Sequence, residues 1–171
     1  MNNLLTDDSL RLRTPRLRFD TWSITDLPFL LALHSDPVVQ TGYPYSPDYW
    51  TETVIAQKLN SYIEEQDTLG TTKWKLSLHD GTFIGRAGWS HWEDGLEIGY
   101  AIMPSHQGRG YALEAATALL AHAREQYPAN RLVGFALPNN RASRTILEKI
   151  GMTYEGQQNI NDIPTAFYRA T

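Results

Sequence analysis

The sequence predicts an α+β fold with a mixed, mostly antiparallel sheet. Residues 74–103 alternate between apolar and polar positions and contain two turn signals, which favours a meander of three strands. One strand pattern and two helical patterns precede this meander, and helical and strand patterns alternate after it. Because 171 residues are enough for one well-packed core, we expect a single domain spanning residues 1–171.

The first third of the chain combines one strand with two helices. Residues 10–19 alternate well enough for a strand, and Thr25-Asp26 supplies a cap for a helix that ends by Pro37. A second helix is expected after Pro47 and Asp48, since residues 54–63 repeat apolar side chains at helical spacing.

The meander then follows from two turn dipeptides. Asp80-Gly81 separates the strands predicted at residues 74–78 and 83–89, and Asp94-Gly95 precedes a third strand at residues 96–103. A helix is predicted at residues 111–127, because the segment is rich in Ala and Leu and Pro128 ends it.

The last third alternates strand and helix. Residues 132–137 read as a buried strand, and Asn139 or Asn140 can cap a helix that stops at Gly151. Residues 152–154 and 165–168 are predicted to be short closing strands.

Composition excludes several functions. Cysteine is absent, which removes disulfides and thiolate chemistry, and the five histidines lack metal-ligand spacing, so we expect no metal and read them as surface or turn residues. Basic residues are dispersed in a chain of net charge −4, which argues against nucleic acid as a partner. Met1–Asp8 does not resemble a secretory signal and no apolar run spans a membrane, so a soluble, cytoplasmic protein is expected.

The segment from Leu96 to Ala112 carries the chemistry. A strand runs through a turn containing Gly108 and Gly110 directly into the Ala-rich helix. Amides at a helix N-terminus lack intrahelical partners and carry partial positive charge, so they can bind a pyrophosphate. The turn lacks the Gly-Lys-Ser/Thr of a P-loop, and Leu113 stands where a dinucleotide fingerprint needs Gly or Ala.

These residues resemble the acyl-CoA signature of the GCN5-related N-acetyltransferases (GNAT), in the form Gln107-x-x-Gly110-x-Ala112. Further matches are similar to the branch of ribosomal-protein N-terminal acetyltransferases: Thr14-Pro-Arg-Leu17, Asp80-Gly-Thr-Phe-Ile-Gly85, Glu97-Ile-Gly-Tyr100, Asn140-x-x-Ser143, Leu147-Glu-Lys-x-Gly151 and Tyr154-Glu-Gly156. The resemblance implies the GNAT fold, with a twisted sheet of about six to seven strands flanked by about four helices.

The resemblance also implies acetyl-CoA as co-substrate. In this family the strand before the signature is bulged and splays from the next strand, and the pantetheine arm inserts there. The residues expected to bind the cofactor are Ile102, Met103, Gln107, Gly108, Arg109, Gly110, Tyr111, Ala112 and Asn140. Asn140 has a second interpretation, because Asn is also a common helix cap.

Two residues are candidates for proton transfer in a direct attack of an amine on the thioester. Glu97 matches the strand carboxylate that acts as base in some relatives, with Gly99 leaving space for substrate; the alternative is a salt-bridged strand acid. Many relatives use a Tyr as acid where this chain has Leu147, so Ser143 is the candidate acid here, and its alternative role is helix capping. Asp20 departs from the Arg common in the branch.

The expected acceptor is a primary amine, either a protein N-terminus or a small molecule. Aromatic residues are expected to line its groove, although such residues more often fill cores: Tyr43, Tyr45, Trp50, Trp89, His91 and Trp92. A non-catalytic acyl-CoA-binding sensor or interaction module is the alternative function. No membrane partner is expected, and a homodimer is left open.

Overall fold

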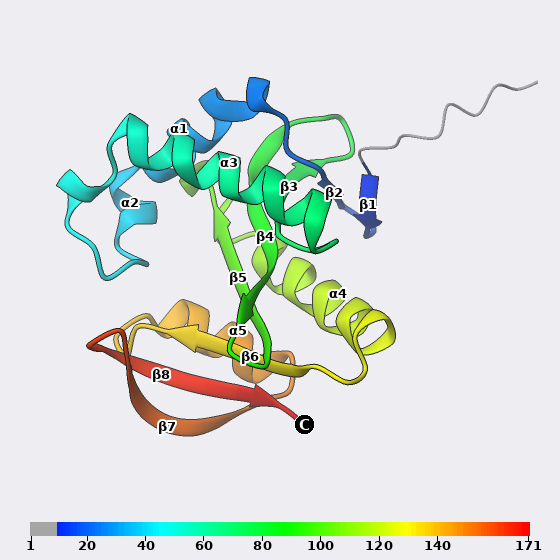
Figure 1. Cartoon of the computed structure of the whole chain (residues 1–171), viewed down its shortest axis with the longest axis vertical. Helices are drawn as coiled ribbons and strands as arrows, with labels where there is room; N and C mark the ends of the chain where they lie inside the picture. The colour runs from blue at the N-terminus through cyan, green and yellow to red at the C-terminus, as the bar shows by residue number, and fades with distance from the viewer. Residues whose placement is uncertain (1–9) are drawn as a thin grey trace, which may run out of the picture.

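The computed structural model describes residues 10–171, and Met1–Asp8, read above for a secretory signal, lies outside the described residues. It contains a mixed sheet of eight strands in the order β1-β2-β3-β4-β5-β6-β8-β7 (Figure 1). The strands are β1 (Leu10–Arg13), β2 (Leu17–Asp20), β3 (Lys73–Leu78), β4 (Phe83–Trp92), β5 (Gly95–Ile102), β6 (Arg131–Ala136), β7 (Met152–Ile160) and β8 (Ile163–Ala170). The predicted α+β class is therefore confirmed, with a strand more than the six to seven expected.

Helices fill the connections between these strands. The α-helices are α1 (Leu27–His34), α2 (Pro37–Gln40), α3 (Glu52–Thr68), α4 (Tyr111–Gln126) and α5 (Arg141–Lys149). Short 3-10 turns are η1 (Ile24–Asp26), η2 (Pro47–Tyr49) and η3 (Pro104–His106). Thr51 caps α3, since its Oγ1 accepts a hydrogen bond from the amide of Val54. The predicted helices agree with the structure, and α2 is an additional short one.

The strand predicted at residues 10–19 is wrong in one respect, because the chain folds back on itself there. β1 and β2 form an antiparallel hairpin around Thr14–Arg16. Pro15 has no amide hydrogen to donate to a ladder, while the Thr14 amide donates to Leu17 O and Thr14 Oγ1 accepts from the Leu17 amide. These two hydrogen bonds close the turn between Thr14 and Leu17.

The sheet opens between β5 and β6. β4 and β5 pair antiparallel up to Gly85 and Ile102, whereas the parallel pairing of β5 with β6 ends at Ile98 and Gly134. From there β6 continues beside β8 only, up to Ala136. The expected splay is thus present, but the expected bulge does not appear in the β4–β5 register, which is continuous.

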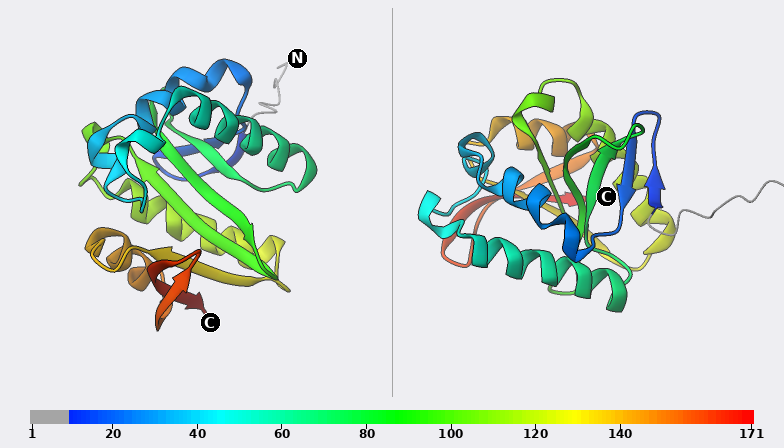
Figure 2. Two further views of the ribbon diagram at one scale, coloured as in Figure 1. Left: turned by 60° about the vertical axis from the view of Figure 1, so that its left-hand side comes forward. Right: turned by 90° about the horizontal axis from the view of Figure 1, so that it is seen from above.

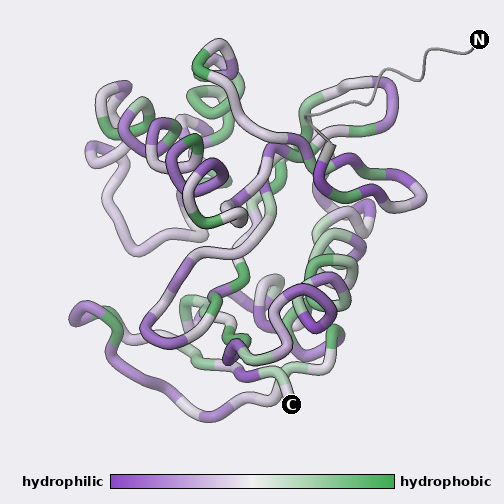
Figure 3. The backbone as a smooth tube through the Cα atoms, turned by 45° about the vertical axis from the view of Figure 1, so that its right-hand side comes forward, coloured by the Kyte–Doolittle hydropathy of each residue, from purple (hydrophilic) through white to green (hydrophobic). Residues whose placement is uncertain are grey.

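Helices cover both faces of the sheet. Figure 2 shows α1 and α3 on one side of β4 and β5 and α4 on the other. The larger core cluster lies on the α4 side and includes Trp89, Ile98 and Leu119. A second cluster lies under α1 and α3 and includes Trp50 and Tyr62. Hydrophobic residues recur turn by turn along α4 in Figure 3, as expected for a helix that buries one face.

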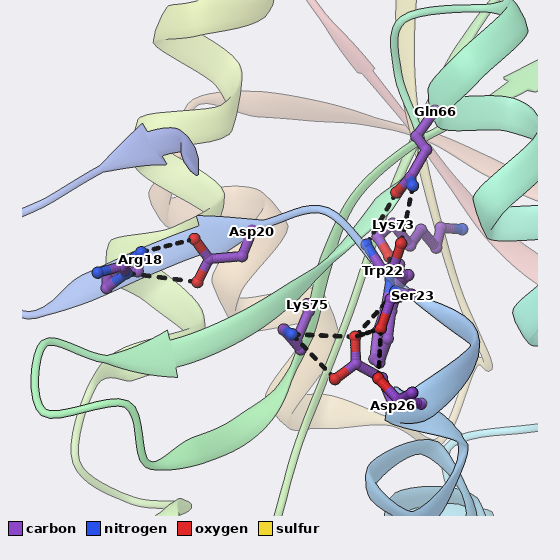
Figure 4. Close-up of polar contacts among 9 residues, drawn as sticks. Arg18, Asp20, Trp22, Ser23, Asp26, Gln66, Lys73 and Lys75 are labelled. Atoms are coloured by element: carbon purple, nitrogen blue, oxygen red, sulfur yellow. Dashed lines mark hydrogen bonds and ion pairs between the residues drawn. The ribbon is translucent and has the colours of Figure 1, made fainter. Parts of the chain in front are cut away.

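Polar contacts fasten α1 and α3 to the sheet (Figure 4). Trp22 exchanges two backbone hydrogen bonds of 2.8 Å with the Gln66 side-chain amide, and its indole Nε1 donates to Lys73 O at 2.7 Å. Lys75 forms an ion pair of 3.0 Å with Asp26 at the start of α1. Asp20, where the branch commonly has Arg, pairs with Arg18 at 3.0 Å. Trp22 thereby links α3 to β3, and the Lys75–Asp26 pair links β3 to α1.

The closing strands are longer than the sequence predicted. β7 and β8 form a long antiparallel ribbon joined by Asn161 and Asp162, both with positive φ, of 50° and 64°. Two left-handed residues in succession are typical of a type I′ hairpin turn, and Asn and Asp tolerate that conformation. Among residues 10–171, no helix is long and apolar enough to cross a lipid bilayer.

Candidate active site

A cleft of about 1250 Å³ runs along the opening between β5 and β6. One end is lined by Gly99–Ile102, the Gly108–Gly110 turn and the start of α5, and we call it the cofactor end. The other end lies between the sheet and α3, with residues 41–45 beside it, and we call it the acceptor end. Every predicted catalytic or cofactor-binding residue except Met103 and Arg109 borders this cleft.

The start of α4 presents unpaired amides to the cofactor end. Gly110 is the N-cap in the left-handed conformation, with φ of 80°, and the helix start carries no side-chain cap. The first intrahelical bond runs from the Glu114 amide to Gly110 O, so the amides of residues 111–113 have no acceptor within the helix. Gly108 also has a positive φ, of 72°, which a residue with a Cβ adopts only with strain. This geometry suits a pyrophosphate.

The β1–β2 turn holds this helix start in place. Glu114 accepts hydrogen bonds from Thr14 Oγ1 at 2.6 Å and from the Arg16 amide at 3.0 Å, and it pairs with Arg16 Nε at 2.5 Å. Arg16 Nη1 also donates to Arg109 O at 2.9 Å. Burial raises the pKa of Glu114, but the hydrogen bonds from Thr14 and Arg16 outweigh it and leave that pKa below its ordinary value.

The free edge of β5 offers backbone groups to the same end. The Met103 amide donates to Ile84 O, so in the alternating antiparallel ladder the groups of Tyr100 and Ile102 face away from β4. Gln107 Nε2 already donates to Ile102 O at 2.9 Å. Both backbone groups of Met103 have protein partners, since Met103 O accepts from the His106 amide. Tyr100 and Ile102 are therefore better placed than Met103 to pair with an extended ligand.

The start of α5 faces the opening. Asn140 Oδ1 caps the helix by accepting from the Ser143 amide at 3.1 Å, so the capping interpretation of Asn140 holds, and the residue also lines the cleft. The Tyr100 hydroxyl lies 3.0 Å from Ser143 O and 3.1 Å from Ser143 Oγ. Burial is the main reason that the pKa of Tyr100 is raised. Leu147 is 1% exposed and belongs to the core.

Glu97 forms an ion pair at the junction of the two ends. Its Oε2 lies 2.6 Å from Lys73 Nζ, and both side chains are mostly buried. Its Oε1 accepts no hydrogen bond from the described residues, which leaves it available to water or an amine. The space expected above Gly99 is taken by Lys73, since a Cβ at Gly99 would lie 2.5 Å from Lys73 Nζ.

Two further cations border the acceptor end. Arg86 is 4% exposed; its Nε lies 3.4 Å from His34 Nε2, and its Nη2 donates to the Tyr43 hydroxyl. Burial, followed by the charges of Arg86 and Lys58, lowers the pKa of His34 to about 2, so His34 is neutral. Burial, followed by the charges of Arg86 and Lys73, lowers the pKa of Lys58 to about 8. We call Lys58, Lys73 and Arg86 the cationic wall.

Three of the six residues expected to line the acceptor groove border the cleft. Tyr43, Tyr45 and Trp50 line the acceptor end. Trp89 is 1% exposed and points to the opposite face of the sheet, because strand residues alternate sides. Trp92 packs on Phe135 and Phe167, outside the cleft, and His91 is exposed.

The reading of all five histidines as surface or turn residues is wrong for His34. It is fully buried in α1 and stacks on Trp50, with ring centroids 4.5 Å apart. In the part of the chain that the structure describes, no three His, Cys, Asp or Glu side chains gather where they could hold a metal ion.

An opened sheet beside an uncapped helix N-terminus defines a class of α+β proteins that bind an extended ligand carrying a pyrophosphate. The family model described as acetyltransferase (GNAT) domain matches residues 16–153. The chain belongs to this family and is an acetyl-CoA-dependent acyltransferase.

Individual relatives agree with this assignment. The uncharacterized N-acetyltransferase YnaD of Bacillus subtilis is 38% identical over 126 residues, which are 68% of this chain and 74% of YnaD. An acetyltransferase structure from Agrobacterium tumefaciens is 31% identical with a TM-score of 0.76, covering 94% of this chain and 93% of that one.

A more distant structure shares the fold. RimL, a ribosomal L7/L12 alpha-N-protein acetyltransferase solved in complex with coenzyme A, has a TM-score of 0.78 at 17% identity, with 94% of this chain and 96% of that chain covered. At this identity the likeness shows the fold alone.

The sequence did not reveal residues that contact the site from distant positions in the chain. Thr14 and Arg16 were noted only as part of the resemblance, and their contact with Glu114 spans about a hundred positions. Arg86 and Lys58 lie in no motif of the sequence analysis. The signal for Arg86 was a charged residue inside an otherwise apolar strand, since residues 83–89 are buried or half-buried.

Proposed function

We propose that the protein moves the acetyl group of acetyl-CoA directly to a primary amine, which is a protein N-terminus or a small molecule. The observation that carries this proposal is the cleft that joins the uncapped start of α4 to Glu97. RimL is by name an alpha-N-protein acetyltransferase, which supports a protein N-terminus as the class of acceptor without deciding it for this chain.

Acetyl-CoA supplies the activated acyl group, and the residues at the cofactor end fit its shape. The amides of Gly108, Arg109, Gly110, Tyr111 and Ala112, with Gln107 orienting the turn, would bind the pyrophosphate. Ile102 would pair with the pantetheine arm through the backbone, with Met103 beside it, and Asn140 would contact the arm while it caps α5.

Glu97 is the proposed base. A primary amine is protonated near neutral pH and must lose a proton before or during its attack. Glu97 Oε1 would receive that proton, through water or directly, while Lys73 holds Oε2 and fixes the orientation of the carboxylate. A new N–C bond forms as the C–S bond breaks, and the proton of the amine leaves through Glu97.

Ser143 is the proposed acid for the departing thiolate. Its hydroxyl lies beside the Tyr100 hydroxyl, so a proton given by Ser143 can be replaced from Tyr100. Because a thiolate also leaves without an acid, removing Ser143 should lower the rate less than removing Glu97.

The test measures free thiol released from acetyl-CoA across a panel of peptide N-termini, amino acids and polyamines. With the best amine, Glu97→Gln should lower kcat by about 100-fold or more. Glu155→Gln is the matched control, because Glu155 pairs with Arg169 outside the cleft. Wild-type turnover in Glu97→Gln would remove Glu97 as the base.

A second arm tests the cofactor end. Gly110→Val places a branched side chain at a φ of 80° and should abolish acetyl-CoA binding measured by calorimetry. Acetyl-CoA binding without thiol release from any amine would instead support a non-catalytic acyl-CoA-binding module.

A further inference from the structure

The cationic wall carries an inference that rests on the proposed function and concerns the chemistry of the acceptor. Three cations border the acceptor end, and among the described residues only Lys73 has a carboxylate within ion-pair distance. Glu65, the second carboxylate at this end, accepts a hydrogen bond from Thr72 Oγ1 at 2.7 Å.

Arg86 is a buried cation whose partners are neutral. The guanidinium stays charged at any pH at which the protein is folded. Its hydrogen bonds go to the neutral imidazole of His34 and to the hydroxyl of Tyr43. Its Nη1 is buried and has no hydrogen-bond partner among residues 10–171. The charge of Glu97 stabilises the Arg86 guanidinium from beyond ion-pair distance, and no carboxylate of residues 10–171 contacts it directly, so the buried cation can still gain from an anion.

Lys58 adds a second cation on the facing helix. Its ammonium lies 5.8 Å from the centroid of the Tyr62 ring, and Arg86 lies 5.8 Å from the same ring. Both cations therefore lie near the same aromatic ring. Burial and the charge of Arg86 lower the pKa of Lys58, whereas Glu65 and Glu97 raise it, and a bound anion would raise it further.

The same face of the sheet also carries Glu97, which pairs with Lys73 of the cationic wall. Glu97 Oε1 is available there and would attract the amine before its deprotonation. An acceptor with an amine at one end and an anion at the other complements both Glu97 and the cations. A polyamine complements only Glu97 and is repelled by Arg86 and Lys58.

We propose that the acceptor amine also carries a carboxylate, which binds to Arg86 and Lys58. The planar guanidinium fork matches the two oxygens of a carboxylate. Arg86, Lys58 and Tyr43 all border the cleft, and Arg86 Nη1 has no hydrogen-bond partner among residues 10–171. The acceptor class is thus an amino acid, an ω-amino acid or a short peptide with a free C-terminus.

The first experiment compares matched acceptors with the wild-type protein: glycylglycine against its amide, an amino acid against its amide, and 4-aminobutyrate against butylamine. We expect kcat/KM to be about 10- to 100-fold higher for the carboxylate in at least one pair. Equal kcat/KM within every pair would overturn the inference and leave the proposed function intact. A preference for 2-aminoethylphosphonate over its carboxylate analogue β-alanine would overturn the carboxylate assignment.

Variants locate the carboxylate. Arg86→Gln should abolish the preference and Lys58→Gln should reduce it, measured as the ratio of kcat/KM for the acid to kcat/KM for its neutral analogue. Lys75→Gln is the matched control, because Lys75 lies on the same sheet face but pairs with Asp26 outside the cleft. If Arg86→Gln fails to fold, Arg86→Lys keeps the charge without the fork and should still lower the preference. An unchanged preference in both Lys58→Gln and the Arg86 variant would overturn the site.

A binding measurement separates this inference from the proposed function. In the presence of coenzyme A, N-acetylglycylglycine should raise the melting temperature of the wild-type protein more than its amide does, and Arg86→Lys should reduce that difference. No turnover of any amine would refute the proposed function. The difference in melting temperature between acid and amide would still test whether the carboxylate site exists. Equal shifts for acid and amide would refute the site.

Discussion

Replacement of Arg16 by Met removes the side chain that ties the β1–β2 turn to the start of α4. Arg16 contributes three contacts there: the 2.5 Å ion pair with Glu114, the 2.9 Å hydrogen bond to Arg109 O, and a position 4.5 Å above the Tyr111 ring. Because its side chain is 46% exposed, the ion pair is worth about 0.2–1 kcal/mol. The hydrogen bond adds about 1 kcal/mol and the ring contact about 0.5 kcal/mol.

The free energy of unfolding should therefore fall by about 2 kcal/mol, which lowers the melting temperature by roughly 4–8 °C in a chain of this size. Since Arg109 is the middle residue of the Gly108–Gly110 turn, which we propose binds the pyrophosphate, the KM for acetyl-CoA should rise by about 5- to 30-fold. The kcat at saturating acetyl-CoA should change by less than about 2-fold, because Arg16 does not border the cleft near Glu97.

The assay is steady-state thiol release at varied acetyl-CoA, together with thermal unfolding. Arg16→Lys keeps the charge without the fork and should lie between wild type and Arg16→Met. Arg124→Met is the control, because Arg124 is an exposed arginine whose Nη2 donates a hydrogen bond to Thr171 O. A lowered melting temperature with a wild-type KM would show that Arg16 supports the fold but not the turn.

Two further predictions concern stability. His34 should make the fold acid-sensitive: its pKa is about 2 in the folded protein against an ordinary 6.5, so below pH 6.5 the unfolded chain takes up a proton that the fold excludes. Wild type should lose about 2 kcal/mol from this source between pH 7 and pH 5 in urea unfolding, and His34→Gln should not; equal losses would contradict the burial argument. Gly134→Ala should lower the free energy of unfolding by about 1–3 kcal/mol, because the added Cβ would lie 2.6 Å from Leu147 Cδ2. Gly42→Ala is the control and should not be destabilised, since the added Cβ would lie 3.4 Å from its nearest neighbour. Equal urea midpoints for the two variants would refute this crowding.

The sequence was most informative where periodicity and turn chemistry act locally. The meander, α4 and the Gly-rich turn were predicted because alternation, the Asp-Gly pairs and Pro128 need only near neighbours. The β1–β2 hairpin was missed although Pro15 signals a break, because the flanking residues alternate on both sides of it. The length of β7 was missed because its residues are mostly exposed and polar, which gives no strand pattern.

For the site, the resemblance predicted which residues gather around the opening, and most of them border the cleft. Their partners were not predictable, because Lys73, Arg16 and Tyr100 reach Glu97, Glu114 and Ser143 across different elements. Sequence separation hides such contacts unless the sheet order is known. The roles of Glu97, Ser143 and the cofactor-binding residues stay predictions.

Side chains packed at the opening between β5 and β6 hold the two strands apart. Gly134, where the two strands part, is surrounded by Leu147, Met152 and Ile98, and the Tyr100 hydroxyl bridges from β5 to Ser143 on α5. The parting of the strands therefore follows from the protein's own packing and hydrogen bonding. When a binding site is built by contacts of the fold, less binding free energy goes into rearranging the protein, and this favours affinity.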